Sequence, residues 1–246
     1  MNITLLFPVL NERLRLQKGI ETCLFYAREN IDIPFKLVIV DNGSDDETPE
    51  IAKSLTEKYP EVEYRRLEIR GVGIAFKTGI EECTSDIVGY MDIDLSTDLK
   101  YLKKTVELFK ERPSLMYVNG SRFSRESNTR GRKWYRKITS AGLVFILKHY
   151  LGMKSSDALC GFTFLRTPFA KELVAKCSDD HGWFYTVEML LRAERMGVEI
   201  EEIPVEWVED YNTTVKVFKT IKNYLVQISK LKKAFRAEAK AEKVSG

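Results

Sequence analysis

The sequence predicts an α/β protein with a single, mostly parallel sheet flanked by helices. Short apolar runs alternate with helical patterns through the first half of the chain, and repeated strand–helix units build parallel sheets. One of these runs, Ile87–Ser96 with the sequence IVGYMDIDLS, ends in two aspartates. A short apolar run of this kind is typical of a buried parallel strand, and ligands of such sheets bind at the carboxyl ends of the strands.

The composition indicates one globular domain. The 246 residues are 44% hydrophobic, which is enough for an α/β core. The 39 Lys and Arg against 36 Asp and Glu give a net charge of only +3, so we expect no nucleic-acid partner. The four cysteines are far apart in the sequence and there are only two histidines, which argues against a zinc site and a disulfide framework. A reducing, cytoplasmic location fits this cysteine usage.

The N-terminal stretch MNITLLFPVL is expected to be the first strand and not a secretion signal, because it lacks a positively charged leader. No run approaches the ~18 apolar residues that span a bilayer. We therefore expect a soluble protein or one bound peripherally to a membrane.

The first half is expected to hold five strands. They are Ile3–Phe7, Lys36–Val40, Val62–Leu67, a strand starting at Ile87, and Leu115–Val118. Helical patterns lie between them, from Leu14 to Arg28, from Thr48, from Gly71 to about Cys83, and from Leu99 to Glu111. Thr48 is the expected N-cap of the second helix and Pro49 its first helical residue, which are the residue types preferred there.

Three polar turns follow the first, second and fourth strands and are expected to meet at one edge of the sheet. They contain Pro8, Asn11 and Glu12, then Asp41, Asn42, Gly43 and Ser44, and then Asp92 and Asp94. An acid after the second strand is well placed to bind a base or a ribose hydroxyl. The same residue types also form ordinary turns, so this motif alone leaves both interpretations open.

The aspartate pair predicts a divalent metal site. Asp92 and Asp94 follow an apolar strand, where uncompensated charge would be costly, although acid pairs also arise by chance in a chain this acidic. Two carboxylates can hold Mg²⁺ or Mn²⁺, whose coordination is completed by substrate phosphates and water. The three turns together therefore predict a pocket for a nucleotide diphosphate, with Asp92 contacting both the metal and the nucleotide.

The glycines at Gly71 and Gly73 raise the alternative of a dinucleotide-binding enzyme. Position 76 is Phe where the third glycine of that fingerprint belongs, and the loop follows the third strand and not the first. A hydride-transfer enzyme is therefore not expected. Gly73 is instead expected to let the helix start close to a ligand, with Lys77 binding a phosphate or the base.

The order of these motifs resembles family 2 glycosyltransferases of the GT-A fold, which has a Rossmann-like sheet. The similar segments are Pro8 to Glu12, Asp41 to Thr48, Gly71 to Gly79, Asp92 to Ser96 and Gly120 to Arg122. Within that family the sequence is similar to the dolichyl-phosphate mannose and glucose synthases, through Asp157 to Phe162, Trp183 to Glu188 and Ile203 to Trp207. The resemblance covers roughly residues 1–216 and implies a donor half over 1–122 and an acceptor half over 123–215.

The sequence departs from that branch in two places. Asn42 replaces the second acid of the usual Asp-Asp-Gly-Ser turn, which keeps hydrogen-bonding capacity but removes a charge. The usual Arg-x-x-Gly-Ser-Lys segment retains only Thr214 and Lys216, so one phosphate-binding arginine is missing. No Gln-x-x-Arg-Trp occurs, which argues against a processive polysaccharide synthase.

The acceptor side has candidate residues for two chemistries. A hydroxyl acceptor needs a general base, for which Asp157 and Glu188 are the candidates. A lipid phosphate is already anionic and needs only cations to position it. The candidate acceptor-binding residues are Arg122, Arg136, Lys216 and Trp183. Each has a structural alternative: Asp157 as a turn cap, Glu188 as a solvated helix residue and Trp183 as a core residue.

Two basic segments of the second half are amphipathic. Arg130–Leu151 combines basic residues with Trp134, Tyr135 and an apolar helix, which describes an element lying along anionic lipid. Residues 216–246 form an expected basic helical tail. Its apolar stripe is Phe218, Ile221, Leu225, Ile228, Leu231 and Phe235. The stripe could pack on the protein itself, on a partner helix or on lipid.

These observations predict a metal-dependent, inverting glycosyltransferase. Its donor would be a UDP- or GDP-linked sugar and its acceptor a polyprenyl (dolichyl-type) phosphate at the cytoplasmic face of a membrane, the inverting outcome being implied by the resemblance. One alternative keeps the donor and uses a glycan or another hydroxyl acceptor. Another is a nucleotide-sugar-binding module without catalysis.

Overall fold

The computed structural model describes residues 1–131, 133–209 and 217–245. The chain divides into two compact units. The first consists of Met1–Gly131 and Ser156–Glu209, and the second of the described residues within Arg132–Ser155 and Asp210–Gly246. The first unit contains the central sheet and all the polar turns predicted to form the donor pocket.

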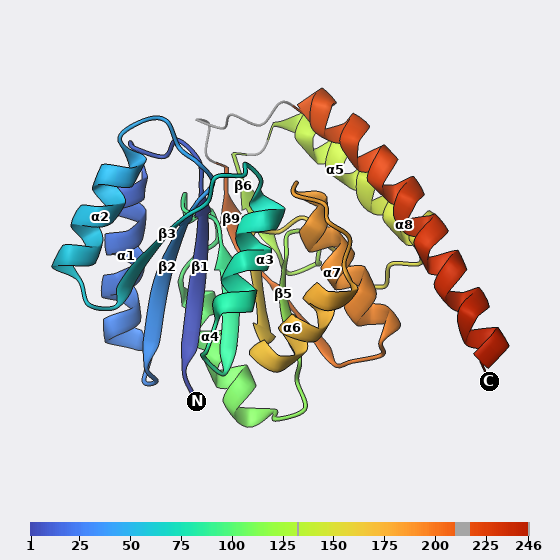
Figure 1. The fold of residues 1–246 in the computed structure, drawn as a ribbon, viewed down its shortest axis with the longest axis horizontal. Coiled ribbons are helices and arrows are strands. Elements are labelled where there is room, and N and C mark those ends of the chain that lie inside the picture. The colour runs from blue at the N-terminus through green and yellow to red at the C-terminus, as the bar shows by residue number, and fades with distance from the viewer. Residues whose placement is uncertain (132, 210–216, 246) are drawn as a thin grey trace. The chain divides into compact units, whose positions relative to one another are not determined.

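The first unit is built on a seven-stranded sheet with the order β3-β2-β1-β4-β7-β5-β8 (Figure 1). Its strands are β1 (Ile3–Val9), β2 (Phe35–Asp41), β3 (Val62–Arg66), β4 (Ile87–Met91), β5 (Tyr117–Ser121), β7 (Phe162–Arg166) and β8 (Ile200–Pro204). All neighbouring pairs are parallel except those of β7, which runs antiparallel to β4 and to β5. The expected mostly parallel α/β sheet is therefore confirmed. A separate pair of short strands, β6 (Asn128–Arg130) and β9 (Glu206–Val208), is also parallel.

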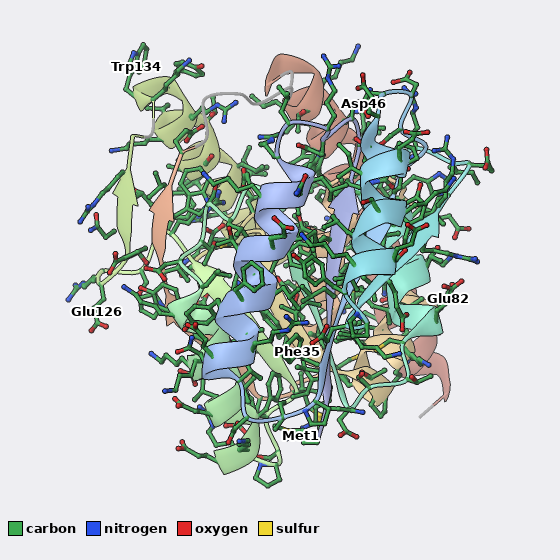
Figure 2. All side chains as sticks on the ribbon, turned by 90° about the vertical axis from the view of Figure 1, so that its left-hand side faces the viewer. Met1, Phe35, Asp46, Glu82, Glu126 and Trp134 are labelled. Carbon is green, nitrogen blue, oxygen red and sulfur yellow. The ribbon has the colours of Figure 1, made fainter. Side chains whose placement is uncertain are left out.

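Helices cover both faces of the sheet. They are α1 (Leu16–Asn30), α2 (Thr48–Lys58), α3 (Val72–Glu82), α4 (Lys100–Glu111), α6 (Thr167–Lys176) and α7 (Phe184–Arg195). Ile3, Leu5 and Phe7 alternate along β1 and share a buried cluster with residues of α1, α2 and α4. Leu6 points to the other face, where it lies against Gly79 of α3. Figure 2 looks onto α1 and α2 where they cover the first of these faces.

Two helices begin at other residues than predicted. The first helix begins at Leu16 and not at Leu14, whose side chain is exposed. The second begins with Thr48 itself after Glu47, so Thr48 is not the N-cap. Its hydroxyl accepts a hydrogen bond from the backbone N–H of Glu12, 2.8 Å away, while its own N–H donates to Asp46. Contacts between two turns, which a local capping rule does not contain, decide both boundaries.

The antiparallel β7 has a consequence for the site. Met91 at the carboxyl end of β4 pairs with Phe162 at the amino end of β7. The segment that precedes β7 therefore lies at the same edge of the sheet as the carboxyl ends of β1, β2 and β4. This brings Asp157–Gly161 beside the aspartate pair.

The second unit consists of α5 (Trp134–Ile146), the π-helical turn η1 (Leu147–Leu151) and α8 (Val217–Ser245). Lys232 of α8 donates a hydrogen bond to the carbonyl of Tyr150 in η1. The C-terminal helix is confirmed, but its stripe differs from the predicted one. Tyr224, Ile228, Leu231 and Phe235 are buried, whereas Leu225 is 48% exposed, and the side chain of Phe218 is not described. The buried residues follow an i, i+4, i+7, i+11 spacing.

None of the helices in the described ranges is both long and apolar enough to cross a membrane. The four cysteines are free thiols, of which Cys23, Cys83 and Cys160 are buried.

Candidate active site

The three predicted turns meet at one edge of the sheet. Val9 at the end of β1 pairs with Asp41 at the end of β2, and β4, which leads to Asp92, is parallel to β1. Because parallel strands end at the same edge, the turns after them form one continuous surface. The structure thus brings together the three turns that were predicted to hold the donor nucleotide and the metal.

The aspartate pair sits on a tight turn directly after β4. The Tyr90 hydroxyl donates to Oδ1 of Asp92 at 2.5 Å, and the Ser96 N–H donates to Oδ1 of Asp94 at 2.9 Å. Leu95 between them has a φ of 51°, a left-handed conformation that costs a non-glycine residue on the order of 1–3 kcal/mol. This turn holds the two carboxylates close to each other.

The electrostatics of the pair suit a cation. Burial raises the pKa of Asp92 to about 6, and the negative charge of Asp94 adds to the rise. A divalent ion would relieve both effects, because it stabilises the charged form of each carboxylate. No group of three or more His, Cys, Asp or Glu side chains suited to a metal occurs in the part of the chain that the structure describes. Asp92 and Asp94 are hard oxygen donors, and two carboxylates are the protein ligands that Mg²⁺ commonly has when phosphates complete its shell.

Gly161 packs directly against the Asp92 carboxylate. A Cβ atom at position 161 would lie 1.8 Å from Oδ2 of Asp92, far inside van der Waals contact. The Gly161 carbonyl also accepts a hydrogen bond from the Asp92 N–H at 3.3 Å. The start of β7 therefore fixes the position of Asp92. The sequence motif around Asp92 did not reveal this contact with Gly161.

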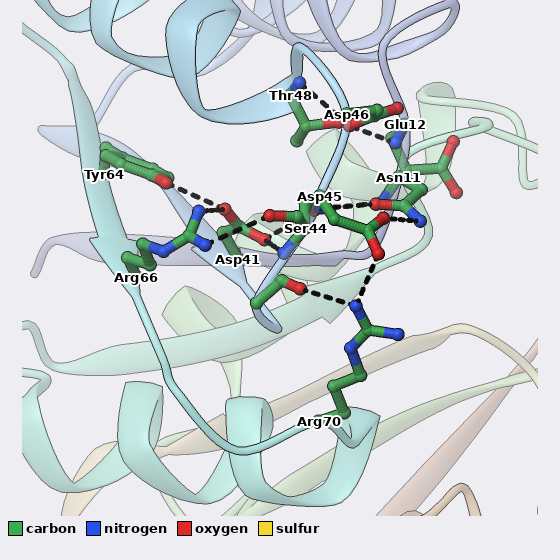
Figure 3. Close-up of polar contacts among 11 residues, drawn as sticks. Asn11, Glu12, Asp41, Ser44, Asp45, Asp46, Thr48, Tyr64, Arg66 and Arg70 are labelled. Atoms are coloured by element: carbon green, nitrogen blue, oxygen red, sulfur yellow. Dashed lines mark hydrogen bonds and ion pairs between the residues drawn. The ribbon is translucent and has the colours of Figure 1, made fainter.

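Asp41 organises the turn after β2 (Figure 3). Its Oδ1 accepts from the N–H and the hydroxyl of Ser44, and its Oδ2 accepts from the Tyr64 hydroxyl at 2.8 Å and from Arg66. Burial, together with the bond to Asp41, raises the pKa of Tyr64 to about 12. The Asp41 side chain is fully buried, so the structure uses it to shape the turn. Its predicted contact with a nucleotide stays a prediction.

Asn42 differs from Asp41 in having an unused acceptor. Its side chain is buried, and Oδ1 has no hydrogen-bond partner among the described residues. A buried polar atom without a partner costs about 1–3 kcal/mol, and a ligand at this edge of the sheet can remove that cost. Asn42 is therefore a stronger candidate for contacting the nucleotide than Asp41.

The turn after β1 is joined to the turn after β2 by side chains (Figure 3). Asn11 donates to the Asp45 carboxylate at 2.6 Å and accepts from the Asp45 N–H at 2.9 Å, while its own N–H donates to the Ser44 hydroxyl. Asn11 has a φ of 57°, which its short polar side chain tolerates better than most. Neighbouring Glu12 forms an ion pair with Arg15 at 2.7 Å. Pro8 is half buried within β1, opposite Val40.

Arg122 and Asp157 form a buried ion pair. The Arg122 guanidinium contacts both Asp157 oxygens, at 2.7 and 3.1 Å, and the N–H groups of Arg122 and Leu159 complete four bonds to the carboxylate. Burial acts to raise the pKa of Asp157, but the Arg122 charge outweighs it and holds that pKa below its usual range. The bond to Leu159 matches the turn-cap alternative. The aspartate is ionised, fully enclosed and committed to Arg122.

Glu188 is also enclosed, so the alternative of a solvated helix residue is wrong. Its carboxylate accepts hydrogen bonds from the N–H and hydroxyl of Ser178 and from Arg192, whose Nε lies 2.8 Å from Oε1. These bonds hold the loop between α6 and α7. Trp183 at the end of this loop is 39% exposed, so it is not a core residue.

The same loop explains the two glycines before α3. A Cβ at Gly71 would lie 2.0 Å from the His181 carbonyl, and one at Gly73 would lie 2.6 Å from the Asp180 carbonyl. The Gly73 N–H donates to the His181 carbonyl at 2.9 Å. The neighbour for which Gly73 makes room is therefore protein backbone, which corrects the expectation of a ligand there. Lys77, one turn later, contacts Asp179 of this loop at 3.0 Å.

Replacing Glu188 with Gln is expected to lower the free energy of unfolding by about 2–3 kcal/mol, because the buried Arg192 loses its charged partner. Urea denaturation measures this. The matched control is Glu172→Gln in α6, whose 3.8 Å pair with Lys176 is exposed and contributes about 0.5 kcal/mol or less. Unchanged stability together with a large fall in kcat would identify Glu188 as a general base instead.

Two predicted acceptor residues stay predictions. Arg136 belongs to α5 in the second unit, and Lys216 lies outside the described residues. No role was predicted for Trp207, over whose ring the Arg122 guanidinium lies at 5.5 Å from the centroid. No role was predicted for Tyr90 either, although Tyr90 stands two residues before Asp92 and an extended chain places both side chains on one face.

An α/β sheet with an aspartate pair at the carboxyl edge, beside a polar turn after the second strand, defines the class of GT-A glycosyltransferases. Two solved structures of glucosyl-3-phosphoglycerate synthase from Mycobacterium tuberculosis have the same fold. The complex with Mn²⁺ and UDP-glucose has a TM-score of 0.69 at 16% identity, covering 94% of this chain and 78% of that one. The complex with Mg²⁺ and UDP has a TM-score of 0.65 at 16% identity, covering 92% and 79%.

Within this class, the family Glycosyl transferase family 2 matches residues 4–174, and the chain belongs to it. Dolichyl-phosphate beta-glucosyltransferase ALG5A of Trichomonas vaginalis is 29% identical over 89% of this chain and 70% of its own length. Glycosyltransferase AglD of Haloferax volcanii is 27% identical over 90% of this chain. The chain spans only 35% of the length of AglD.

Proposed function

We propose that the protein transfers a sugar from a nucleoside-diphosphate donor to a polyprenyl phosphate, with inversion at the anomeric carbon. The observation that carries this proposal is the Arg122–Asp157 pair, which holds a fixed cation next to the aspartate pair. Both carboxylates that were candidates for a general base are enclosed and hydrogen-bonded. Such a site suits an acceptor that is already anionic, because a phosphate oxygen needs no proton removed before it attacks.

In this proposal, different residues of the chain bind the metal, the nucleotide and the acceptor phosphate. Asp92 and Asp94 would hold Mg²⁺ or Mn²⁺, which supplies positive charge to the departing diphosphate when bound. Asn42 would accept a hydrogen bond from the nucleotide, and Arg122 would orient the acceptor phosphate. The phosphate oxygen forms a bond to the anomeric carbon as the bond from that carbon to the nucleoside diphosphate breaks, and the electron pair leaves with the diphosphate.

The relatives support a particular donor and acceptor. ALG5A of Trichomonas vaginalis and a second relative, from Dictyostelium discoideum, are both named dolichyl-phosphate beta-glucosyltransferase. A neighbour in structure was solved with UDP-glucose and Mn²⁺. We therefore propose UDP-glucose as the first donor to test and GDP-linked sugars as the second.

A donor screen tests this function. Purified protein would be given UDP- or GDP-linked sugars with Mg²⁺ or Mn²⁺, and release of free nucleotide would be followed with and without polyprenyl phosphate in vesicles. We expect turnover that requires the lipid phosphate. Turnover only with a glycan or another hydroxyl acceptor would replace the lipid by that acceptor, and no turnover with any donor would contradict the enzymatic proposal.

We further propose that the second unit binds the cytoplasmic face of an anionic membrane. Trp134, Ile138 and Phe145 of α5 are 73%, 62% and 61% exposed, and no residue of α5 is buried. Lys133 and Lys137 flank this apolar surface. Exposed aromatic and aliphatic side chains beside lysines are the composition of interfacial helices.

The double variant Lys133→Gln, Lys137→Gln is expected to weaken binding to phosphatidylglycerol vesicles about 30-fold, since each basic residue contributes about 1 kcal/mol near an anionic surface. Co-sedimentation measures the change, and hydrolysis of the donor should stay at the parent rate. The control variant, Lys103→Gln with Lys104→Gln, removes two exposed lysines from α4 of the first unit. Equal binding by all three proteins would contradict a membrane-binding role for α5.

A further inference from the structure

The strand β9 contacts both halves of the proposed site. Its residue Trp207 forms a bridge with Thr97, and the Val208 N–H donates to the Ser96 carbonyl at 2.8 Å. Ser96 in turn donates its own N–H to Asp94. Two consecutive hydrogen bonds through the backbone of Ser96 therefore join the carboxylate of the metal-ligand candidate Asp94 to β9.

The Trp207 side chain reaches the acceptor side. The Arg122 guanidinium carbon lies 5.5 Å from the centre of the Trp207 ring, within the range of a cation–π contact. Asp157 holds the edge of the same guanidinium through its two oxygens. Arg122 is thus fixed by an aspartate along its edge and by an aromatic ring as well.

β9 itself is held in place on both sides. It pairs in parallel with β6, where Trp207 lies opposite Thr129. On the other side the Glu206 carbonyl accepts from the Asp98 N–H at 3.3 Å, and the Glu206 N–H donates to the Tyr101 hydroxyl at 3.0 Å. A displacement of the loop after Asp94 would therefore be transmitted to Trp207, because several hydrogen bonds resist a change at β9 alone.

We infer that Trp207 is a positioning residue that couples the donor–metal loop to Arg122. In this role, a divalent ion and a donor diphosphate held by Asp92 and Asp94 would displace residues 94–98, the bridge at Thr97 would transmit that displacement to Trp207, and the Trp207 ring would position the guanidinium that receives the acceptor phosphate. The coupling is reciprocal, so an anion bound at Arg122 strengthens binding at the metal loop by the same factor. The inference rests on the proposed function for the identity of the acceptor, but not for the coupling itself.

The coupling can be measured without turnover. The Nε–H of Arg122 is buried in an ion pair and should give a resolved NMR signal, which Arg122→Lys identifies by its loss. We expect Mg²⁺ with UDP to shift this signal in the parent protein and in Trp207→Phe, which keeps an aromatic ring. In Trp207→Leu the shift should be lost while Mg²⁺ and UDP still bind. A shift of parental size in Trp207→Leu, or no shift in the parent protein, would overturn the inference.

Kinetics give a second readout. A cation–π contact of about 0.5–2 kcal/mol predicts that Trp207→Leu raises KM for a short-chain isoprenyl phosphate by about 2- to 30-fold, with kcat changed much less. Trp207→Phe should restore most of the KM, which loss of packing alone would not explain. An equal KM in Trp207→Leu and the parent contradicts the inference. If the parent uses no isoprenyl phosphate at all, the proposed acceptor is wrong and the NMR result alone decides the coupling.

Discussion

Replacing Asp94 with Asn is expected to lower the rate of sugar transfer about 10²- to 10³-fold, the size of effect seen when one group that stabilises transition-state charge is removed. Asn keeps an oxygen that accepts the Ser96 N–H, so the turn should be preserved. It removes the negative charge that a divalent ion requires. Activity in the variant should therefore depend on a higher Mg²⁺ or Mn²⁺ concentration, which a metal titration of nucleotide release measures.

The matched control for this variant is Asp86→Asn. Asp86 immediately precedes β4, at the opposite edge of the sheet, and accepts hydrogen bonds near the N-terminus in an exposed position. Its replacement should leave the metal dependence unchanged. If Asp94→Asn transfers the sugar at the parental rate and metal concentration, Asp94 is not a metal ligand. If neither protein transfers sugar and both bind the nucleotide sugar equally well, the protein is a nucleotide-sugar-binding module.

Replacing Gly161 with Ala is expected to reduce transfer about 10²-fold, although no charged group is removed. The added Cβ would sit 1.8 Å from Oδ2 of Asp92, so the carboxylate must move by more than an ångström. A displacement of that size in a catalytic geometry costs about 10²-fold in rate. Mn²⁺ affinity in the presence of UDP should fall by about 10- to 100-fold as well, because the ligand is no longer held in place.

Electron paramagnetic resonance of Mn²⁺ provides the measurement. The control is Gly142→Ala in α5, where an added Cβ meets no atom within 4 Å. That variant should bind Mn²⁺ as the parent does. Parental Mn²⁺ affinity in Gly161→Ala would show that Asp92 is not held by the start of β7.

The meeting of the three polar turns at one edge of the sheet could be predicted from sequence because it depends on local patterns. Each of β1, β2 and β4 is an apolar run ending in a polar turn, and the parallel alternation of strands and helices places those turns together. The limits appear where partners are distant in sequence. The pattern that predicts a nucleotide contact for Asp41 did not show that Tyr64 and Arg66 of the next strand bind its second oxygen.

The proposed acceptor side depends on contacts that no local pattern contains. An antiparallel β7 follows from how the chain returns to the sheet after residue 155, and apolar spacing does not encode strand direction. Gly73 packs against the backbone of a loop more than 100 residues later in the chain, and no local pattern contains that contact either. The same holds for the contact of Arg122 with Trp207. The sequence indicated Gly73 and Arg122 as candidate site residues, but not the neighbours that each one has.

The bonds between Asn11 and Asp45, and between Glu12 and Thr48, bear on how a donor would bind. They make two turns from different parts of the chain into one preassembled rim. A nucleotide arriving there would not have to order either turn, so little of its contact energy would be offset by lost conformational entropy. Donor affinity would then depend mainly on the fit of the nucleotide to a shape that already exists.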